Sequence, residues 1–269
     1  MICIETLEGV RYDLASIGLI PLNFTPSSPS PKHFTEEIEG RNGYLDLGTT
    51  FGGRTIRVKF LLEGKDIYDY FLLIAEVFKL FDARTTFFLI NKYEPGKRWR
   101  VKTSTMYTPD RLNPLSAAVD IEFKSSSTFC ESYGTTLNPF TFDSELWQVG
   151  QGVISEDLVY VHNTSSFRIW NGSDIEIDPR ELPLLIKYQG VSDRLTIKNL
   201  STGDDWSYSG TSSINDTITL DGVKSLKNGQ SILKSTNKKL ITLKPGWNDF
   251  ELTGASDFLI TFDFRFYYF

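Results

Sequence analysis

Few residue types in this chain have a spacing that supports catalysis or metal binding. The two histidines, His33 and His162, lie in a proline-rich segment and a strand-like segment, and no metal-ligand triad can be built around them. His162 as a catalytic base would need a nucleophile and an orienting acid, yet no G-x-S-x-G motif occurs. We predict that the protein is not an enzyme, with no catalytic residue, no metal and no cofactor.

One pair of acids resembles a glycosidase arrangement, in which two carboxylates flank a sugar bond. Asp204 and Asp205 stand beside Trp206. Neighbouring residues in a turn rarely converge on one bond, so the segment from Thr202 to Trp206 is interpreted as a hairpin loop in which Asp and Gly serve turn geometry. No phosphate-binding G-x-x-x-x-G-K-[ST] or G-x-G-x-x-G motif is present.

Aromatic side chains in the second half leave a binding function open. An exposed ring beside polar groups can bind the apolar face of a saccharide. Of Trp170, Trp206, Tyr208 and Trp247, the residues Trp206 and Tyr208 are the better surface candidates for a saccharide or a partner, because their flanks are polar. Packing inside the domain is the alternative for both.

Length and composition indicate a globular protein of two domains. The chain has 269 residues, of which 40% are hydrophobic, 14% aromatic and 23% charged. Residues 1–130 hold 16 basic and 16 acidic residues, so the net charge of -6 lies in the second half. The only basic cluster, Lys97 to Lys102, fits a strand with a solvated face or a charged subunit interface. Nucleic acid is not an expected partner.

The first residues lack the basic and apolar regions of a signal peptide. No stretch approaches the roughly 20 apolar residues that span a bilayer, so we expect synthesis in the cytoplasm and no membrane anchor. Cys3 and Cys130 are the only cysteines. They are too few for a disulfide scaffold and lack metal-ligand spacing, which favours reduced core thiols.

The first half is predicted to be a sheet with one helix. Alternating apolar residues predict an opening hairpin and four later strands, at 2–7 with 10–14, 55–62, 86–90, 99–103 and 117–123. Three prolines in residues 25–32 favour an extended, mobile arm. Turns are expected at Gly40 to Gly43 and at Phe51 to Arg54.

The helix is expected from Asp66 to Asp82, with Asp66 as its N-cap. Its main apolar stripe is Ile67, Tyr70, Phe71, Ile74, Val77, Phe78 and Phe81. Leu72, Leu73 and Leu80 lie away from this stripe, and one helix on a small sheet cannot enclose so much apolar surface. We therefore place these three leucines at the subunit interface of a homo-oligomer.

The second half is predicted to be a β-sandwich without a helix. Eight strands are expected, at 159–163, 167–171, 184–188, 195–199, 217–220, 240–243, 250–252 and 258–268, separated by turn pairs such as Asn171-Gly172. In the last strand, Phe258 to Tyr268 alternates with period two, so one face must be buried within a sheet. The domains are placed at 1–135 and 136–269.

These segments, in this order, resemble the distal tail protein (Dit) family of long, flexible-tailed bacteriophages of the kind that infect Gram-positive hosts. The match covers nearly the whole chain. The segments that carry it are the helix from Asp66 to Asp82, 118–123 leading into 129–133, 167–172, 183–186, 195–199, 216–222, 243–248 and 264–268.

The resemblance implies a mainly β protein in which an N-terminal tail-tube-like domain closes into a hexameric ring, single or stacked as two rings. A C-terminal galectin-like or carbohydrate-module-like sandwich would project outward. Such a virion protein would be the hub at the distal end of the tail, joining the tail tube to the tip and docking tip, receptor-binding or baseplate proteins. DNA would cross its channel without being read. The alternative function is a lectin-like module for host cell-wall saccharide.

Overall fold

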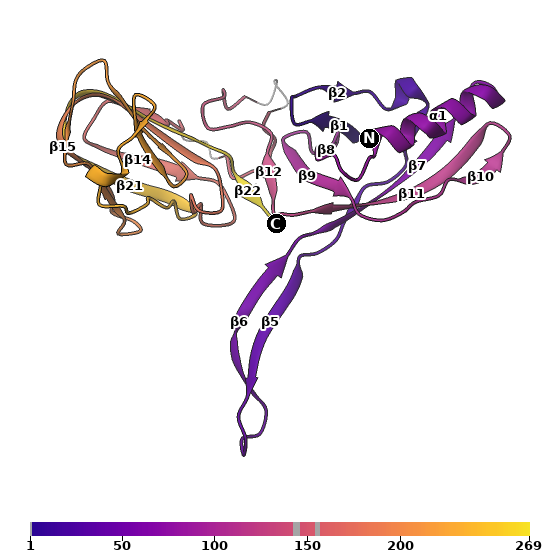
Figure 1. Ribbon diagram of the computed structural model, residues 1–269, viewed down its shortest axis with the longest axis horizontal. Coiled ribbons are helices and arrows are strands. Elements are labelled where there is room, and N and C mark those ends of the chain that lie inside the picture. Colours follow the sequence, from indigo (N-terminus) through magenta and orange to yellow (C-terminus); the bar gives the residue numbers. More distant parts are fainter. Residues whose placement is uncertain (1, 142–145, 154–156) are drawn as a thin grey trace. The chain divides into compact units, whose positions relative to one another are not determined.

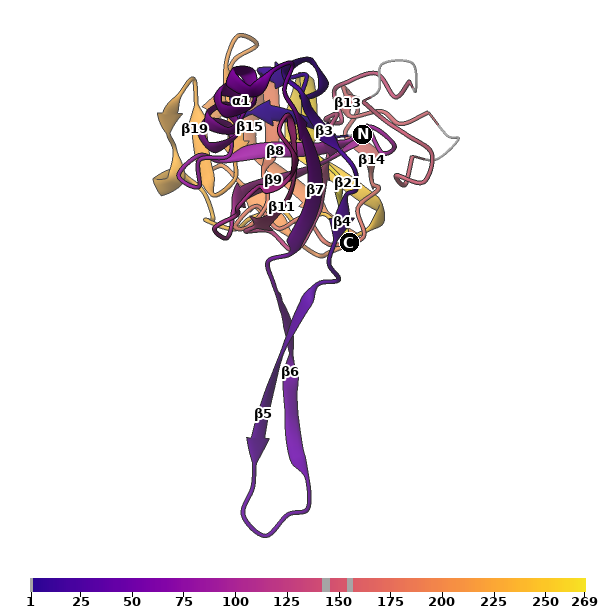
Figure 2. The same cartoon turned by 90° about the vertical axis from the view of Figure 1, so that its right-hand side faces the viewer.

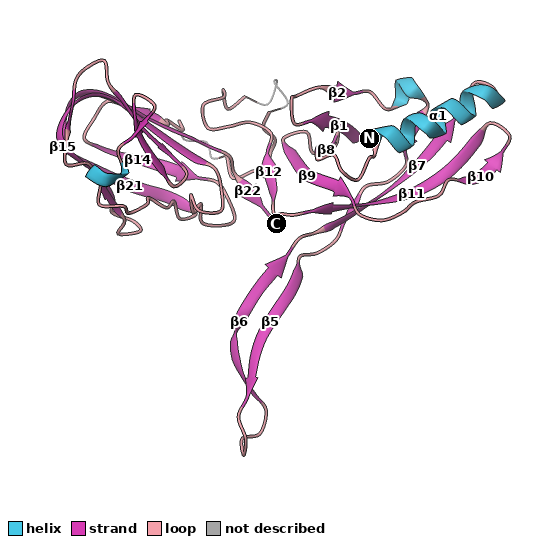
Figure 3. Ribbon diagram, viewed as in Figure 1, coloured by secondary structure: helices cyan, strands magenta, loops and turns pink. Residues whose placement is uncertain are grey.

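The computed structural model describes residues 2–141, 146–153 and 157–269. Contacts divide the chain into a first unit, Met1–Cys130 with Phe269, and a second unit, Glu131–Tyr268. The domain boundary expected from the sequence, between residues 135 and 136, stays a prediction. Strands dominate both units, and α1 (Ile67–Leu80) is the α-helix of the described residues (Figure 3). No helix in these ranges is long and apolar enough to cross a membrane.

Antiparallel pairing organises the first unit into one main sheet (Figures 1 and 2). Its strands are β1 (Ile2–Thr6), β2 (Arg11–Tyr12), β3 (Leu19–Pro21), β4 (Thr25–Pro26), β7 (Thr55–Glu63), β8 (Phe87–Asn91), β9 (Lys97–Thr103), β10 (Asp110–Asn113) and β11 (Ser116–Ser125). The order is β2-β1-β8-β9-β11-β7-β3, with β4 beside β7 and β10 beside β11. A short 3₁₀ turn, Ala15–Ile17, precedes β3. The predicted strands of this half are confirmed.

Alternation along the central strands explains which face is buried. On β7, Val58 and Phe60 are 1% and 0% exposed, whereas Arg57 between Ile56 and Val58 is exposed. Their cross-strand partners on β11 are also apolar and buried, since Val58 pairs with Ile121 and Phe60 with Val119. One face of the sheet is thus the core of this unit.

The N-terminus of α1 is fixed by Asp66, as predicted. The Asp66 carboxylate accepts hydrogen bonds from the N–H groups of Tyr68 and Asp69, both at 2.8 Å. Tyr70, Leu73 and Val77 are the buried residues of the helix. The expected stripe is therefore rotated: it included Ile67, Phe71 and Phe78, which are exposed, and left out Leu73.

Removing this cap is expected to loosen the helix. The Asp66→Ala variant should lose about 1 kcal/mol of helix stability, because two N–H groups lose their acceptor. Hydrogen exchange of the peptide spanning 67–80 should then become about fivefold faster. The matched control is Glu76→Ala, on an exposed helix position with no capping role. Equal exchange rates in the two variants would contradict the prediction.

A long hairpin interrupts the first unit between β4 and β7. β5 (Ser30–Glu37) and β6 (Tyr44–Gly52) pair over eight positions, and almost every residue is exposed (Figures 1 and 2). The segment 25–32 is extended and mostly exposed, as expected, and β4 and the start of β5 occupy it. Prolines are tolerated in a two-stranded ribbon, where half of the backbone N–H groups need no strand partner. The predicted Gly40–Gly43 turn forms the tip.

The second unit is a curled antiparallel sheet whose two layers share strands. Its elements are β12 (Cys130–Ser132, beginning at the last residue of the first unit), β13 (Val161–His162), β14 (Ser166–Asn171), β15 (Leu184–Asn199), β16 (Asp205–Ser207), β17 (Thr211–Ser212), β18 (Thr217–Asp221), β19 (Lys224–Lys227), β20 (Gln230–Ser231), the 3₁₀ turn Leu233–Ser235, β21 (Gly246–Phe264) and β22 (Tyr267–Tyr268). The order is β13-β21-β15-β18-β19-β20, with β14 on β21 and both β16 and β17 on β15.

Two long strands, β15 and β21, pass from one layer of the curled sheet to the other. β15 replaces the separate strands expected at 184–188 and 195–199, and β21 likewise joins the last two expected strands. Their pairing shifts register at Gly190/Val191 and between Ser192 and Thr196, where the ribbon bends. The rings of Phe250 and Phe262, both on β21, consequently stand only 4.9 Å apart. The strand expected at 240–243 is wrong, since only Leu243 forms a bridge, to Ile177.

The apolar face predicted for the last strand is confirmed from Ile260 onward, whereas Phe258 is half-buried. Ile260, Phe262, Phe264 and Phe266 are 0–2% exposed, and Tyr268 is 4% exposed. This end of the second unit lies beside its beginning, because Ser132 N–H donates to Phe266 O at 2.7 Å.

The cysteines form no disulfide. Cys130 is 2% exposed, and burial, which disfavours the thiolate, raises its pKa to about 12. Cys3 is only half-buried. The core position expected for the cysteines is therefore confirmed for Cys130, and Cys3 lies nearer the surface.

Candidate assembly surfaces

The outward side of α1 is an exposed apolar strip. Tyr68 is 80%, Leu72 65% and Phe71 57% exposed, and Ile67 and Phe78 extend the strip along the helix. Monomers seldom leave large contiguous apolar patches in water, so such a strip indicates a protein contact.

The three leucines predicted at an interface have different surroundings. Leu72 lies in the exposed strip, and Leu80 is half-buried at the end of the helix. Leu73 is 4% exposed, so its expected place at a subunit interface is wrong. Helical geometry puts position 73 on the same side as Tyr70 and Val77, facing its own sheet.

An arginine from β10 borders this strip. The guanidinium of Arg111 lies 5.2 Å from the ring centroid of Tyr70 and 5.8 Å from that of Phe71. Its Nη2 donates to Pro114 O at 2.9 Å, which orients the side chain. Aromatic residues and arginine are enriched in protein interfaces, so the composition of the strip suits a protein partner.

The β5–β6 hairpin offers a second exposed surface. In the strand register, Phe34 is opposite Gly48, and the next residue towards the tip, Leu47, is the extra residue of a β-bulge. The side chains of Phe34 and Leu47 are both more than half exposed. Towards the tip stand three exposed carboxylates, Glu36, Glu37 and Glu39, which we call the acidic end of the hairpin.

The basic segment predicted at Lys97 to Lys102 divides between two roles. Arg98 is largely buried, with its guanidinium 3.9 Å from the ring centroid of Phe88 and its Nη1 3.5 Å from a carboxylate oxygen of Glu5. Arg100 and Lys102 are exposed on the same strand. Together with Lys124 of β11 they line a groove. We call this groove, with its three cations and the residues of its floor, the basic groove. The floor residues are Gly53, Thr86, Val101, Thr103, Ser104, Ser125 and Ser126.

The aromatic pair proposed for a saccharide is not on the surface. Trp206 is 1% exposed, and its Nε1–H donates to Ser225 Oγ at 3.2 Å. Tyr208 is 8% exposed. The expectation that their polar flanks bring them to the surface is wrong, because both side chains point into the domain from an alternating segment. A saccharide cannot reach a ring so deeply covered.

The acids beside Trp206 hold the loops around it. Asp204 accepts hydrogen bonds from Thr242 N–H at 2.9 Å and Thr242 Oγ1–H at 2.6 Å. Asp205 pairs with Lys239 at 2.5 Å, and the hydrogen bond from this lysine lowers the pKa of the Asp205 carboxyl. The two carboxylates thus bind separate partners, as expected for turn residues.

The histidines also make local contacts. His33 Nδ1 lies 2.8 Å from Thr49 Oγ1 across the hairpin. The His162 ring stacks on Phe167 with a centroid distance of 4.4 Å, and burial lowers the pKa of this imidazole. Among residues 2–141, 146–153 and 157–269, no three His, Cys, Asp or Glu side chains gather closely enough to hold a metal ion.

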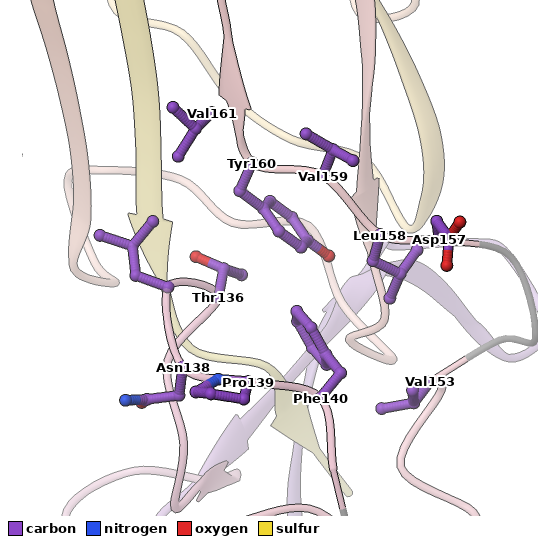
Figure 4. Close-up of a pocket in the computed structure, with 11 residues that line it drawn as sticks. Thr136, Asn138, Pro139, Phe140, Val153, Asp157, Leu158, Val159, Tyr160 and Val161 are labelled. Carbon is purple, nitrogen blue, oxygen red and sulfur yellow. The ribbon is translucent and has the colours of Figure 1, made fainter.

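A pocket in the second unit lies between two segments, 136–140 and 157–161, with Val153 at one side (Figure 4). Tyr160 forms part of its wall, and its hydroxyl donates to Trp170 O at 2.8 Å. Asp157 supplies the charge of the lining. The Tyr160 hydroxyl is thus engaged in a structural hydrogen bond. The described lining residues include no pair of converging catalytic groups.

Comparison with known proteins shows a family and solved structures to which the chain is similar. Residues 12–125 match the family described as "Phage tail protein RIFT-related domain". The matched stretch contains the main sheet from β2 through β11, the hairpin and α1. No curated protein sequence matches the chain.

The whole chain has the fold of a distal tail protein, which confirms the predicted resemblance. The crystal structure of the Dit protein of phage SPP1, described as a paradigm of the hub adsorption apparatus in phages that infect Gram-positive bacteria, superposes with a TM-score of 0.72 at 14% identity, covering 99% of each chain. Two structures of the phage p2 baseplate in its activated conformation, with Sr and with Ca, give TM-scores of 0.49 and 0.48 at 10% identity, covering 98% of this chain and 97% of theirs.

Proposed function

We propose that this chain is a distal tail hub protein of a long-tailed phage. Copies would form a hexameric ring, single or stacked, that joins the tail tube to the tip at the distal end of the virion tail. The second unit would dock tip or receptor-binding proteins. The observation that carries the proposal is the likeness to the Dit fold over 99% of both chains, together with the phage tail domain in residues 12–125.

The exposed strip on α1 supports self-assembly, with a second copy as its occupant. A head-to-tail contact joins two different surfaces of identical chains, and it closes into a ring when the rotation per copy fits. The strip supplies an aromatic and aliphatic contact on one side of such a joint. Leu72 lies within this strip, whereas Leu80 would contribute only through its exposed part.

Electron microscopy and light scattering on the purified full-length chain test the ring. We expect annular particles with the mass of six copies or of two stacked rings. A monomer at every concentration, with no annular particle on the grid, would contradict the proposal. Addition of a tail tube protein and a tip protein from the same phage should then give complexes that retain this ring.

A charge in the apolar strip is expected to disrupt the ring. The Leu72→Glu variant should raise the dissociation constant between copies about tenfold or more, because a carboxylate would be buried without a partner. The control is Ile214→Glu in the second unit, where the native side chain is 51% exposed. Sedimentation velocity over a concentration series measures both. If the two variants assemble equally well, the strip is not the contact.

A further inference from the structure

We propose that the acidic end of the hairpin of one copy docks in the basic groove of the adjacent copy. This inference rests on the proposed function, since it concerns how neighbouring copies are joined. The occupant is a second copy of this chain, and the contact is an ionic one between Glu36, Glu37 and Glu39 and the three cations Arg100, Lys102 and Lys124.

Like charges face each other in the groove. Lys124 of β11 is directly opposite Lys102 of β9 in the strand register. Like charges at directly opposed positions destabilise a strand pair. Arg100 precedes Lys102 by two residues and therefore lies on the same face. None of the three side chains forms an ion pair or hydrogen bond with a described residue, so the groove within one copy lacks the anion that would relieve this repulsion.

The hairpin carries the opposite arrangement. Glu36, Glu37 and Glu39 are exposed, and their carboxylates make no ion pair or hydrogen bond within the described chain. Next to them, Phe34 and Leu47 are 51% and 58% exposed on the same ribbon. The hairpin end thus combines unneutralised carboxylates with apolar contact area, which is the composition of a docking element.

A copy cannot fill its own groove with its own acids. The groove floor includes Gly53, which follows β6 directly, so the groove lies at the root of the hairpin. Glu37 ends β5 seven residues after Ser30, about 23 Å away at the usual rise per residue. The carboxylates therefore stand at the far end of a straight ribbon, and Figures 1 and 2 show this ribbon running away from the sheet.

The root of the hairpin is held tightly, which keeps the ribbon extended. Arg54 Nε donates to Ser27 O at 2.7 Å, and the Arg54 guanidinium lies 4.7 Å from the ring centroid of Trp99. A Cβ at Gly53 would lie 2.1 Å from Ser125 O, so the chain passes the groove in close backbone contact. A ribbon fixed in this way presents its acidic end to another molecule.

Nucleic acid is the alternative ligand for the basic groove, because the groove carries three cations. A DNA surface usually spreads basic residues along a face so that several phosphates are neutralised. Here residues 1–130 have equal numbers of basic and acidic residues. An acidic protein segment is the better match, and the chain itself supplies one.

Complementary charge reversal tests the contact. One variant carries Glu36→Lys, Glu37→Lys and Glu39→Lys, and the other carries Arg100→Glu, Lys102→Glu and Lys124→Glu. Each alone should associate about tenfold more weakly or worse, because like charges would meet at every joint. An equimolar mixture should recover rings, since alternating copies are then complementary at both kinds of joint. The control, Asp193→Lys with Asp249→Lys and Glu251→Lys, changes net charge as the first variant does and should assemble normally.

Zero-length carbodiimide coupling provides an independent readout, because it joins a carboxylate to an amine in contact. A mixture of unlabelled and ¹⁵N-labelled full-length chains should give mixed-isotope cross-links from the hairpin glutamates to Lys102 or Lys124. Wild-type rings without such cross-links, or rings from either reversed variant alone, would overturn this contact and leave the hub proposal standing. Absence of both rings and cross-links would overturn both. If groove reversal leaves rings intact and weakens binding to duplex DNA, the groove serves DNA and the contact is overturned.

Discussion

The Phe262→Ala variant is expected to lose about 3–5 kcal/mol of the unfolding free energy of the second unit. Phe262 is 0% exposed, and its ring contacts those of Phe250 and Phe167 at centroid distances of 4.9 and 5.9 Å. These rings belong to both layers of the curled sheet. Truncation would remove the apolar contact between the layers and leave a cavity that the bent strands cannot close.

Tryptophan fluorescence during urea unfolding measures this loss, because four of the five tryptophans lie in the second unit. The matched control is Leu259→Ala on the same strand, where the side chain is 46% exposed and a change of about 0.5 kcal/mol or less is expected. Equal midpoints for the two variants would show that Phe262 does not join the layers.

A second large effect is expected for Gly190→Ala, at the bend of β15. Gly190 has φ 149°, a region that L-residues rarely adopt. An added Cβ would lie 2.5 Å from both Asp257 O and Phe258 Cα of the paired strand. Backbone strain alone costs about 1–3 kcal/mol, and the overlap with β21 adds to it, so the second unit should unfold at distinctly lower urea.

Gly203→Ala separates the two causes. Gly203 also has positive φ, at 84°, but no atom lies within 4 Å of its would-be Cβ. This variant should show the strain without the overlap, and therefore a smaller loss. If it is as damaging as Gly190→Ala, close approach at the bend is not the reason for glycine there.

Local patterns predicted the elements of the first unit well, because those patterns reflect local physics. The cap at Asp66 follows from its carboxylate and the helix that begins after it, and alternation in β7 follows from one buried face. The buried side of α1 was harder to predict. Aromatic and aliphatic residues surround the helix, so spacing alone could not distinguish Leu73, which meets the sheet, from Phe71, which meets water.

In the second unit the sequence predicted strands but not their continuity. Gly190 and Arg194 at the bend of β15 look like ordinary loop residues, because a bulge and a strand end use the same positive-φ positions. Trp206 was a candidate for the surface because its neighbours are polar, with packing inside the domain as the alternative, and alternation along β16 sends Asp205 outward and Trp206 inward. Tertiary packing decides such cases, and no local signal shows it.

The candidate assembly surfaces were only partly accessible from sequence. The three prolines predicted an extended arm, and Gly40 and Gly43 predicted the turn that forms the hairpin tip. Lys102 belongs to the basic cluster in the sequence, whereas Lys124 lies apart from it. Only strand register brings these two lysines opposite each other.

The adjacency of Ser132 and Phe266 bears on how such proteins change in evolution. The chain enters and leaves the second unit through neighbouring strands, joined by Ser132 N–H to Phe266 O and by Arg265 Nη1 to Ser132 O at 2.9 Å. The chain between Ser132 and Phe266 is therefore attached through this one pair of neighbouring segments. A lineage could therefore exchange or enlarge this whole module by recombination at one place.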